Sequence, residues 1–254
     1  KYFRANENFG APRGVLIAGD ITEDGDNGDQ TANSCGEWNA FESFFPAAGD
    51  PSNPSRIKYP VLEGYGNHDF TLMPTQADAD LRYKVISKKI VNRHTARFAA
   101  LGLGSTHYGT QIDNKAAYFW DWEDIRFFNL NLKPSGSYTC GSNTNAYHGV
   151  TTGADNVCKE VITSSSGKIR IAHPQYALGF LEANLKTNSQ IVVMTHYGPR
   201  NQTRLANDEL ENFCNILTAK KVRVIAWLTG HSHTNDYYDW SCNGYAVPVL
   251  NVGS

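Results

Sequence analysis

Four apolar segments of the chain are each followed directly by polar side chains that can bind metal ions. Carboxylate and amide oxygens and imidazole nitrogens are ligands of intermediate hardness, which suit divalent transition ions such as Mn, Fe, Co or Zn. The segments span residues 13–19, 60–66, 190–195 and 222–228, and the polar residues after them are Asp20, Asn67, His68, Asp69, His196, His231 and His233.

The two histidines after the last apolar segment have a spacing that suits two metal ions. His231 and His233 follow Gly230 with one residue between them. In extended backbone their side chains would point the same way, roughly 6–7 Å apart, and could reach two ions about 3.5–4 Å apart. A pair of surface histidines in a turn is the alternative, so the four clusters have to be considered together.

Apolar strands and amphipathic helices alternate along the chain, which predicts an α/β fold. Ligands collect beyond the carboxyl ends of such strands, so the polar clusters are expected to converge there. Residues 133–172 are polar, and we expect a loop insertion that borders a cleft. Pro248 favours an edge position for the last strand. Helices are expected at 35–46, 77–101, 174–186 and 205–220, a hairpin at 117–131 and the last strand at 245–253.

Composition and charge indicate an ordinary globular protein. The 254 residues are 41% hydrophobic with a net charge of −2, so a single domain over residues 1–254 can bury a sizeable core. No apolar run approaches the roughly 18–20 residues of a membrane span, and the charge does not favour nucleic acid as a partner.

The helix expected at 77–101 carries basic residues that could form a nucleic-acid or membrane patch. A solvated helix face is the preferred interpretation, because Asp78 and Asp80 offset the charge locally. The basic residues are Lys84, Lys88, Lys89, Arg93 and Arg97.

The chain has five cysteines and no Cys-x-x-Cys pair, which argues against a zinc ribbon or a thioredoxin-type motif. Cys140 and Cys158 flank a polar loop, and a disulfide between them would suit an oxidising compartment. Five reduced thiols in a cytosolic protein are the alternative. We expect a secreted or extracytoplasmic protein.

The clusters together resemble four of the five sequence blocks of the calcineurin-like metallophosphoesterase family, and most closely its secreted-type members. Order and approximate spacing match, and the resemblance spans nearly the whole chain. It implies a four-layer α-β-β-α sandwich of two mixed sheets with two divalent metal ions at their edge. The matching blocks are Gly19-Asp20, Gly66-Asn67-His68-Asp69, His196 and Gly230-His231-Ser232-His233.

The resemblance also implies a role for each matching residue. Asp20 would bridge the two metal ions, and His233 would serve the second ion. His68 would protonate the leaving oxygen or hold the phosphate, with Asp69 orienting or polarising it. A metal-bound hydroxide would attack phosphorus in line. The first metal site would be completed by Asn67, His196 and His231.

The sequence departs from the family pattern in two places. The family's first block, Asp-x-His, does not occur before Asp20. We expect this block and its strand upstream of Lys1 in the intact protein, which makes the domain N-terminally incomplete here. Glu23 stands where purple acid phosphatases have the tyrosine that binds iron, so a tyrosine–iron centre is not expected.

The leading hypothesis for function is hydrolysis of a small-molecule or lipid phosphate ester at a dinuclear metal centre. Arg200, just after the third cluster, could hold a phosphate oxygen through a bidentate contact, or it could be an ordinary surface arginine. Two other functions stay open: a catalytically impaired surface or assembly protein of this family, and a nucleotide phosphodiesterase.

Overall fold

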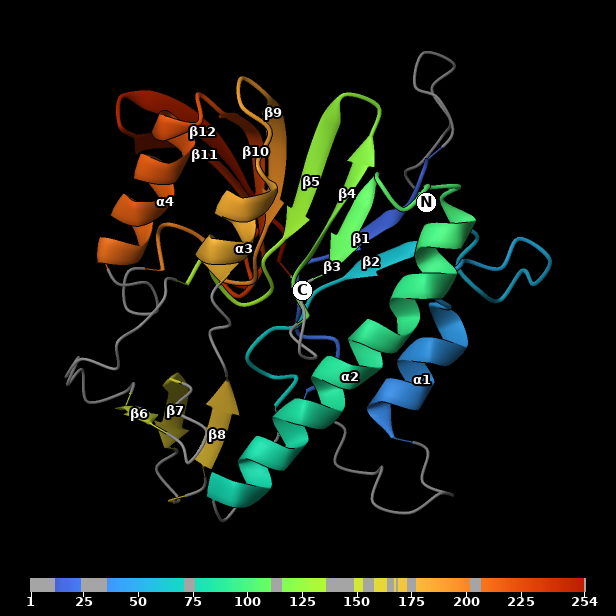
Figure 1. Cartoon of the computed structure of the whole chain (residues 1–254). Coiled ribbons are helices and arrows are strands. Elements are labelled where there is room, and N and C mark those ends of the chain that lie inside the picture. The colour runs from blue at the N-terminus through green and yellow to red at the C-terminus, as the bar shows by residue number, and fades with distance from the viewer. Residues whose placement is uncertain are drawn as a thin grey trace.

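The computed structural model describes residues 12–23, 36–70, 76–110, 116–135, 149–152, 158–163, 167, 169–172, 177–201 and 207–253. Its largest sheet consists of β3 (Tyr108–Thr110), β4 (Tyr118–Trp122), β5 (Ile125–Asn129), β9 (Gln190–Met194), β10 (Arg223–Thr229), β11 (Asp236–Cys242) and β12 (Tyr245–Asn251). These seven strands form a mixed sheet in the order β11-β12-β10-β9-β5-β4-β3 (Figure 1).

A second, parallel sheet is formed by β1 (Val15–Ile17) and β2 (Val61–Glu63). The helices are α1 (Glu37–Phe44), α2 (Gln76–Ala100), α3 (Ala177–Asn184) and α4 (Asn207–Ala219). Helices α3 and α4 pack on one face of the large sheet (Figure 1), and Phe98 of α2 packs with Leu62 of β2 and Tyr118 of β4. The expected α/β sandwich is confirmed, and two parallel strands represent its second sheet among the described residues.

The central strands bring their carboxyl ends to one edge of the large sheet. Strands β5, β9, β10 and β12 run parallel to one another. Residues 191–194 of β9 are all buried, as expected for a parallel strand covered on both faces. Polar residues that follow these strands therefore gather at one end of the molecule.

Pro248 does not lie on an edge strand, so that prediction is wrong. Strand β12 lies between β10 and β11. The pairing of β12 with β10 begins at Val249. Pro248, which has no N–H to donate, therefore lies just before the hydrogen bonds between these two strands. The edge is taken by β11, a strand that we did not expect, although the alternation of Tyr238, Trp240 and Cys242 with Asp239 and Ser241 is typical of a half-exposed strand.

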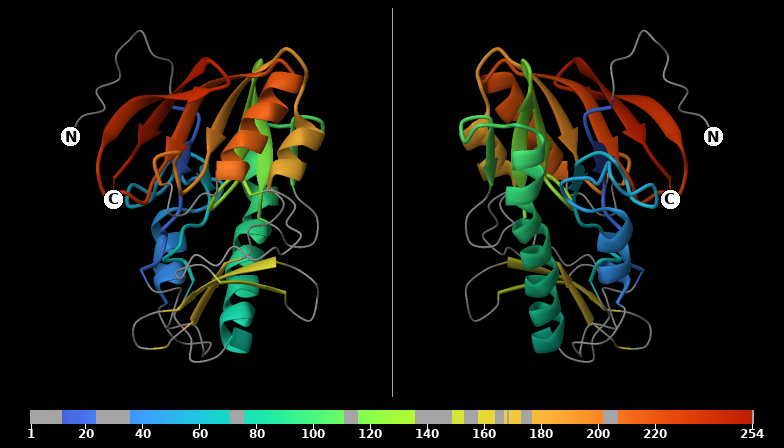
Figure 2. Two further views of the ribbon diagram at one scale, coloured as in Figure 1. Left: turned by 90° about the vertical axis from the view of Figure 1, so that its left-hand side faces the viewer. Right: turned by 90° about the vertical axis from the view of Figure 1, so that its right-hand side faces the viewer.

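Part of the range predicted to be a polar loop is a small antiparallel sheet. It consists of β6 (Gly149–Thr152), β7 (Cys158–Thr163) and β8 (Ile169–Ala172) (Figure 2). Strand β8 lies against α2. The polar composition concealed short runs of β-branched residues, such as Val161-Ile162-Thr163, that favour strands.

Two arginines predicted on the solvated face of α2 are buried instead. Arg93 is 6% exposed and Arg97 is fully buried. Both donate to the carboxylate of Glu63, which is itself buried, and Arg93 Nε lies 2.9 Å from Glu63 Oε1. These charges therefore join α2 to the end of β2 and are not available to bind a polyanion.

The Cys214–Cys242 disulfide joins α4 to β11, with 5.4 Å between the two Cα atoms. The structure does not test the expected Cys140–Cys158 disulfide, because Cys140 lies outside the described residues. Among the helices that the structure describes, none combines the length and apolar character required to cross a bilayer.

His94 on α2 predicts an acid-dependent loss of stability. Burial, and secondarily the charge of Arg97, hold its pKa well below the ordinary value, and its ring packs on Tyr118 and Phe98. Below about pH 6.5 the unfolded chain takes up a proton that folded His94 refuses, so the stability that is present at higher pH is lost as pH falls. We expect a loss of about 1.4 kcal/mol per pH unit from this residue.

Chemical denaturation of the metal-free protein between pH 5 and 8 measures this slope. The variant His94→Leu should lack the His94 part of the pH dependence. Identical slopes for the wild type and the variant would contradict the assignment.

Candidate metal centre

Four of the predicted ligands converge at the edge where the two sheets meet. Ligand atoms of Asp20, His196 and His231 all lie within 4.8 Å of one another. Asn67 Oδ1 lies 2.9 Å from His196 Nε2 and 2.9 Å from His231 Nδ1, and Asp20 Oδ2 lies 3.2 Å from His196 Nε2. Metal–ligand bonds of about 2.1 Å at right angles would place neighbouring donors about 3.0 Å apart, so these separations fit a shared cation.

The proton on His196 also favours a cation among these groups. Its Nδ1 lies 2.9 Å from the carbonyl oxygen of Ala18 and donates to it. In the neutral ring Nε2 then carries only a lone pair, which faces the oxygens of Asn67 and Asp20. Three lone pairs directed at one another repel, whereas a metal ion would accept all three. A backbone carbonyl that fixes the second nitrogen is the usual outer partner of a metal-binding histidine.

Asp20 uses its two carboxylate oxygens for different contacts. Oδ1 accepts a hydrogen bond of 2.8 Å from the backbone N–H of His68, and Oδ2 faces His196. Burial opposes ionisation of this carboxyl group, but a protonated His196 ring, which donates to Asp20 and attracts it, and the His68 N–H outweigh it and lower the Asp20 pKa. The residue is therefore an anion placed between two loops of the site.

The backbone at the site adopts conformations that non-glycine residues rarely take. Asp20, His231 and His233 have φ values of 53°, 71° and 53°, in the left-handed region. The loops that carry Asp20 and Asn67 also touch, since a Cβ on Gly19 would lie 2.5 Å from the backbone nitrogen of Gly66. Such strain is typical of functional sites, where the surrounding structure holds it in place.

The extended spacing predicted for His231 and His233 is wrong. Both residues lie in a bend with positive φ, so the simple geometry of alternating side chains does not apply. His231 joins the cluster, whereas His233 is exposed and is not among the residues that converge. A role for His233 at a second metal ion remains a prediction.

His68 lies at the border of the site and contacts Glu23. Its Nδ1 is 2.9 Å from the Glu23 carbonyl oxygen and 3.5 Å from Glu23 Oε1. The side chain is 33% exposed, which leaves it accessible from solvent. The partner of His68 Nδ1 is therefore Glu23 and not Asp69.

Asp69 is fully buried and connects the Asp20 loop to the Asn67 loop. It accepts hydrogen bonds from the backbone N–H groups of Thr22, at 2.8 Å, and Gly66, at 2.6 Å. Burial raises the pKa of Asp69 to about 6, although these two hydrogen bonds act in the opposite direction. These hydrogen bonds hold the backbone of the two loops together. A role for Asp69 in orienting the His68 ring remains a prediction.

Arg200 is held at the surface by two neighbours on β11. Its Nη1 donates to Asp236 Oδ2 at 2.7 Å, and its guanidinium carbon lies 3.5 Å from the centre of the Tyr238 ring. The side chain is 60% exposed. A phosphate contact would therefore have to compete with Asp236 or use the remaining N–H groups.

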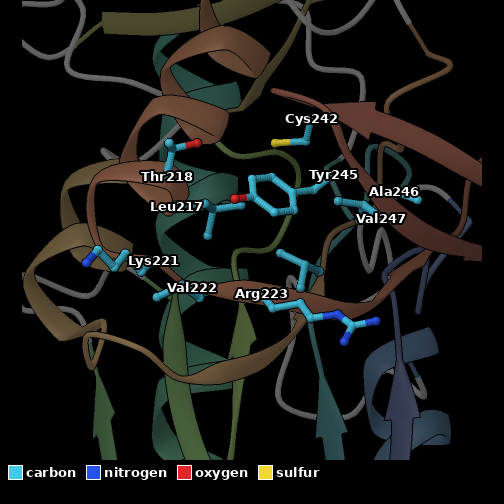
Figure 3. Close-up of a pocket in the computed structure, with 10 residues that line it drawn as sticks. Leu217, Thr218, Lys221, Val222, Arg223, Cys242, Tyr245, Ala246 and Val247 are labelled. Atoms are coloured by element: carbon cyan, nitrogen blue, oxygen red, sulfur yellow. The ribbon is translucent and has the colours of Figure 1, made fainter.

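A cavity of about 300 Å³ adjoins the metal cluster. It is lined by residues at the ends of β1, β9 and β10, including Asp20, His196 and His231. A larger cavity of about 400 Å³ lies at the opposite end of β10, between α4 and the β11–β12 turn (Figure 3). Arg223, which borders it, begins the strand that ends at Thr229, so the two cavities are roughly 20 Å apart along the strand.

Sequence analysis missed several residues that support the ligands. Thr22 and the carbonyls of Ala18 and Glu23 act through backbone groups, which residue type does not reveal. Asn129 and Asn131 follow the apolar residues of β5 in the same way that the ligands follow their strands. That pattern could have identified them as part of the site.

Carboxylate, amide and imidazole groups thus meet at the strand ends of two neighbouring sheets, an arrangement that suits a metal-dependent phosphoesterase. The sequence model of the calcineurin-like phosphoesterase family matches residues 1–235, so the chain belongs to this family.

Comparison with curated proteins finds no match. Among solved structures, the chain is similar to a phosphopantetheinyl hydrolase from Mycobacterium tuberculosis, with 16% identity and a TM-score of 0.42 over 94% of this chain and 79% of that chain. A likeness at this level does not bear on the substrate.

Proposed function

We propose that the protein hydrolyses small-molecule or lipid phosphate esters at a dinuclear metal centre. The observation that carries this proposal is the convergence of Asp20, Asn67, His196 and His231, with donor atoms 2.9–3.2 Å apart. These residues would hold one divalent ion, such as Mn, Fe or Zn. When bound, metal ions supply Lewis-acid chemistry by polarising phosphoryl oxygens and making water nucleophilic near neutral pH.

Around that centre the chain's own residues would position the substrate and supply a proton. The Glu23 carbonyl keeps a proton on His68 Nδ1. The ring would therefore have to be the doubly protonated imidazolium for Nε2 to give a proton to the leaving oxygen or donate to a phosphoryl oxygen. Arg200 is the candidate for a further phosphate contact, through the N–H groups that Asp236 does not use. Asp69 would act indirectly, by fixing the loops that carry Asp20 and Asn67.

A second metal ion would need ligands beyond Asp20 and His233, and the surface beside β1 is the candidate place for them. Strand β1 pairs only with β2 among the described residues. The cavity beside it is lined by apolar residues such as Leu16 and Leu228, and Val252, which also lines it, is 62% exposed. Further ligands for a second ion could approach Asp20 across this surface.

We infer an oxidising, extracytoplasmic location from the Cys214–Cys242 disulfide. Both cysteines are 4% exposed, so the bond would be protected once formed. Thiol titration of denatured protein from its native source, with and without reductant, would test this. Free thiols at both positions would overturn the inference.

Metal analysis combined with reporter turnover tests the proposed function. The purified protein should contain divalent metal and hydrolyse p-nitrophenyl phosphate or its bis ester. Chelation should abolish the activity, and added Mn²⁺ should restore it. A folded protein that is inactive and free of metal would instead favour the catalytically impaired surface or assembly protein.

A further inference from the structure

Asn129 connects the two sheets directly behind the metal cluster. It is the last residue of β5 and is completely buried. Its Nδ2 donates at 2.8 Å to the carbonyl oxygen of Glu63, the last residue of β2. Its Oδ1 accepts at 2.9 Å from the backbone N–H of Asn131. One side chain therefore joins the ends of two strands that belong to different sheets.

Asn131, which donates to Asn129, is in turn hydrogen-bonded to His196. The Asn131 carbonyl oxygen accepts from the backbone N–H of His196 at 2.6 Å. On the other side, Glu63 is four residues before Asn67 in the loop that follows β2. The hydrogen bonds through Asn129 thus span the same two loops whose side chains meet where Asn67 Oδ1 lies 2.9 Å from His196 Nε2.

The fit around Asn129 is tight. A Cβ on Gly64 would lie 2.8 Å from Asn129 Oδ1 and 3.1 Å from its Nδ2, so glycine at this position allows the loop to approach the amide. Loss of the amide would leave the buried Asn131 N–H without its acceptor, and water does not reach a fully buried site to replace it.

We propose that Asn129 is a positioning residue that sets the separation between the Asn67 and His196 loops and thereby the affinity for metal. This inference rests on the proposed function, because it takes these two residues as ligands. Partners one step beyond the metal ligands typically change affinity by about 10–100-fold when removed. Asn129 would act at that level without touching the metal.

Tyr118 offers a matched control. Its hydroxyl donates to the same Glu63 carbonyl oxygen at 2.9 Å, but it has no hydrogen bond to Asn131 among those of the described residues. Tyr118→Phe therefore removes a buried hydrogen bond to β2, together with the interaction of the hydroxyl with the Asn129 side chain, but leaves the Asn129 contacts with Glu63 and Asn131 in place. Asn129→Leu removes these two contacts.

Titration calorimetry with Mn²⁺, together with chemical denaturation, tests the proposal. We expect Mn²⁺ affinity to fall at least about tenfold in Asn129→Leu and less than about threefold in Tyr118→Phe, with similar losses of stability. Gly64→Ala is a second variant in case Asn129→Leu does not fold. It keeps the amide but crowds it, so it should weaken Mn²⁺ binding in the same direction.

The outcomes separate this inference from the proposed function. Wild-type protein that binds Mn²⁺, with Asn129→Leu and Gly64→Ala binding it equally well, would overturn the positioning role alone. Equal weakening by Asn129→Leu and Tyr118→Phe would show a general structural effect and would also overturn it. Wild-type protein that binds no Mn²⁺ would overturn the proposed function and this inference with it.

Discussion

Replacing His196 by alanine is expected to lower phosphoesterase turnover by at least about a thousandfold, because a metal ligand contributes several kcal/mol to catalysis. Its Nε2 faces both Asn67 and Asp20, so no neighbouring side chain can substitute for it. The measurement is kcat/KM for a phosphate ester reporter in Mn²⁺, alongside the metal content of the purified variant.

The loss should be specific to the site. His196 is 1% exposed, and its removal deprives the Ala18 carbonyl of a donor, at a cost of about 1–3 kcal/mol in stability. Folding of the variant therefore has to be confirmed by denaturation. His107→Ala is the control, since that side chain is 57% exposed and lies outside the cluster. Turnover within about tenfold of wild type in His196→Ala would mean that the centre is wrongly assigned.

Replacing Glu63 by alanine is expected to lower the free energy of unfolding by about 3–5 kcal/mol, because it leaves buried guanidinium charge without its counter-ion. Arg97 is fully buried and Arg93 nearly so, and both donate to the Glu63 carboxylate. Arg93 keeps contacts with Glu42 and the Phe45 carbonyl oxygen, so Arg97 bears most of the loss. Urea denaturation measures the effect.

A double variant distinguishes the buried charge from the loss of packing. Glu63→Leu combined with Arg97→Met replaces the pair by apolar groups of similar size, which is often close to neutral for buried ion pairs. The double variant should therefore be clearly more stable than Glu63→Ala. If the single change costs less than about 1 kcal/mol, or the double variant is equally unstable, the ion pair does not have the assigned role.

The sequence by itself determined which residues follow the apolar strands, and this was enough for the family and the fold class. Asp20, Asn67, His196 and His231 were identified because each follows a run of apolar residues, and parallel strands end at one edge. The periodicity of 77–101 likewise predicted helix α2, which spans Gln76–Ala100. These features are local, so the order of residues along the chain is sufficient to reveal them.

Only the tertiary structure decided which groups support the ligands and which charges are buried. Arg97 belongs to the same series of basic residues on α2 as the exposed Lys88, and only the proximity of β2 places it on Glu63. Asn129 donates a hydrogen bond to Glu63, 66 positions away in the sequence, and the Ala18 carbonyl accepts one from His196, 178 positions away. His231 and His233 diverge because their backbone turns into a left-handed conformation. Such contacts depend on how segments distant in sequence pack together, and residue spacing carries no record of that.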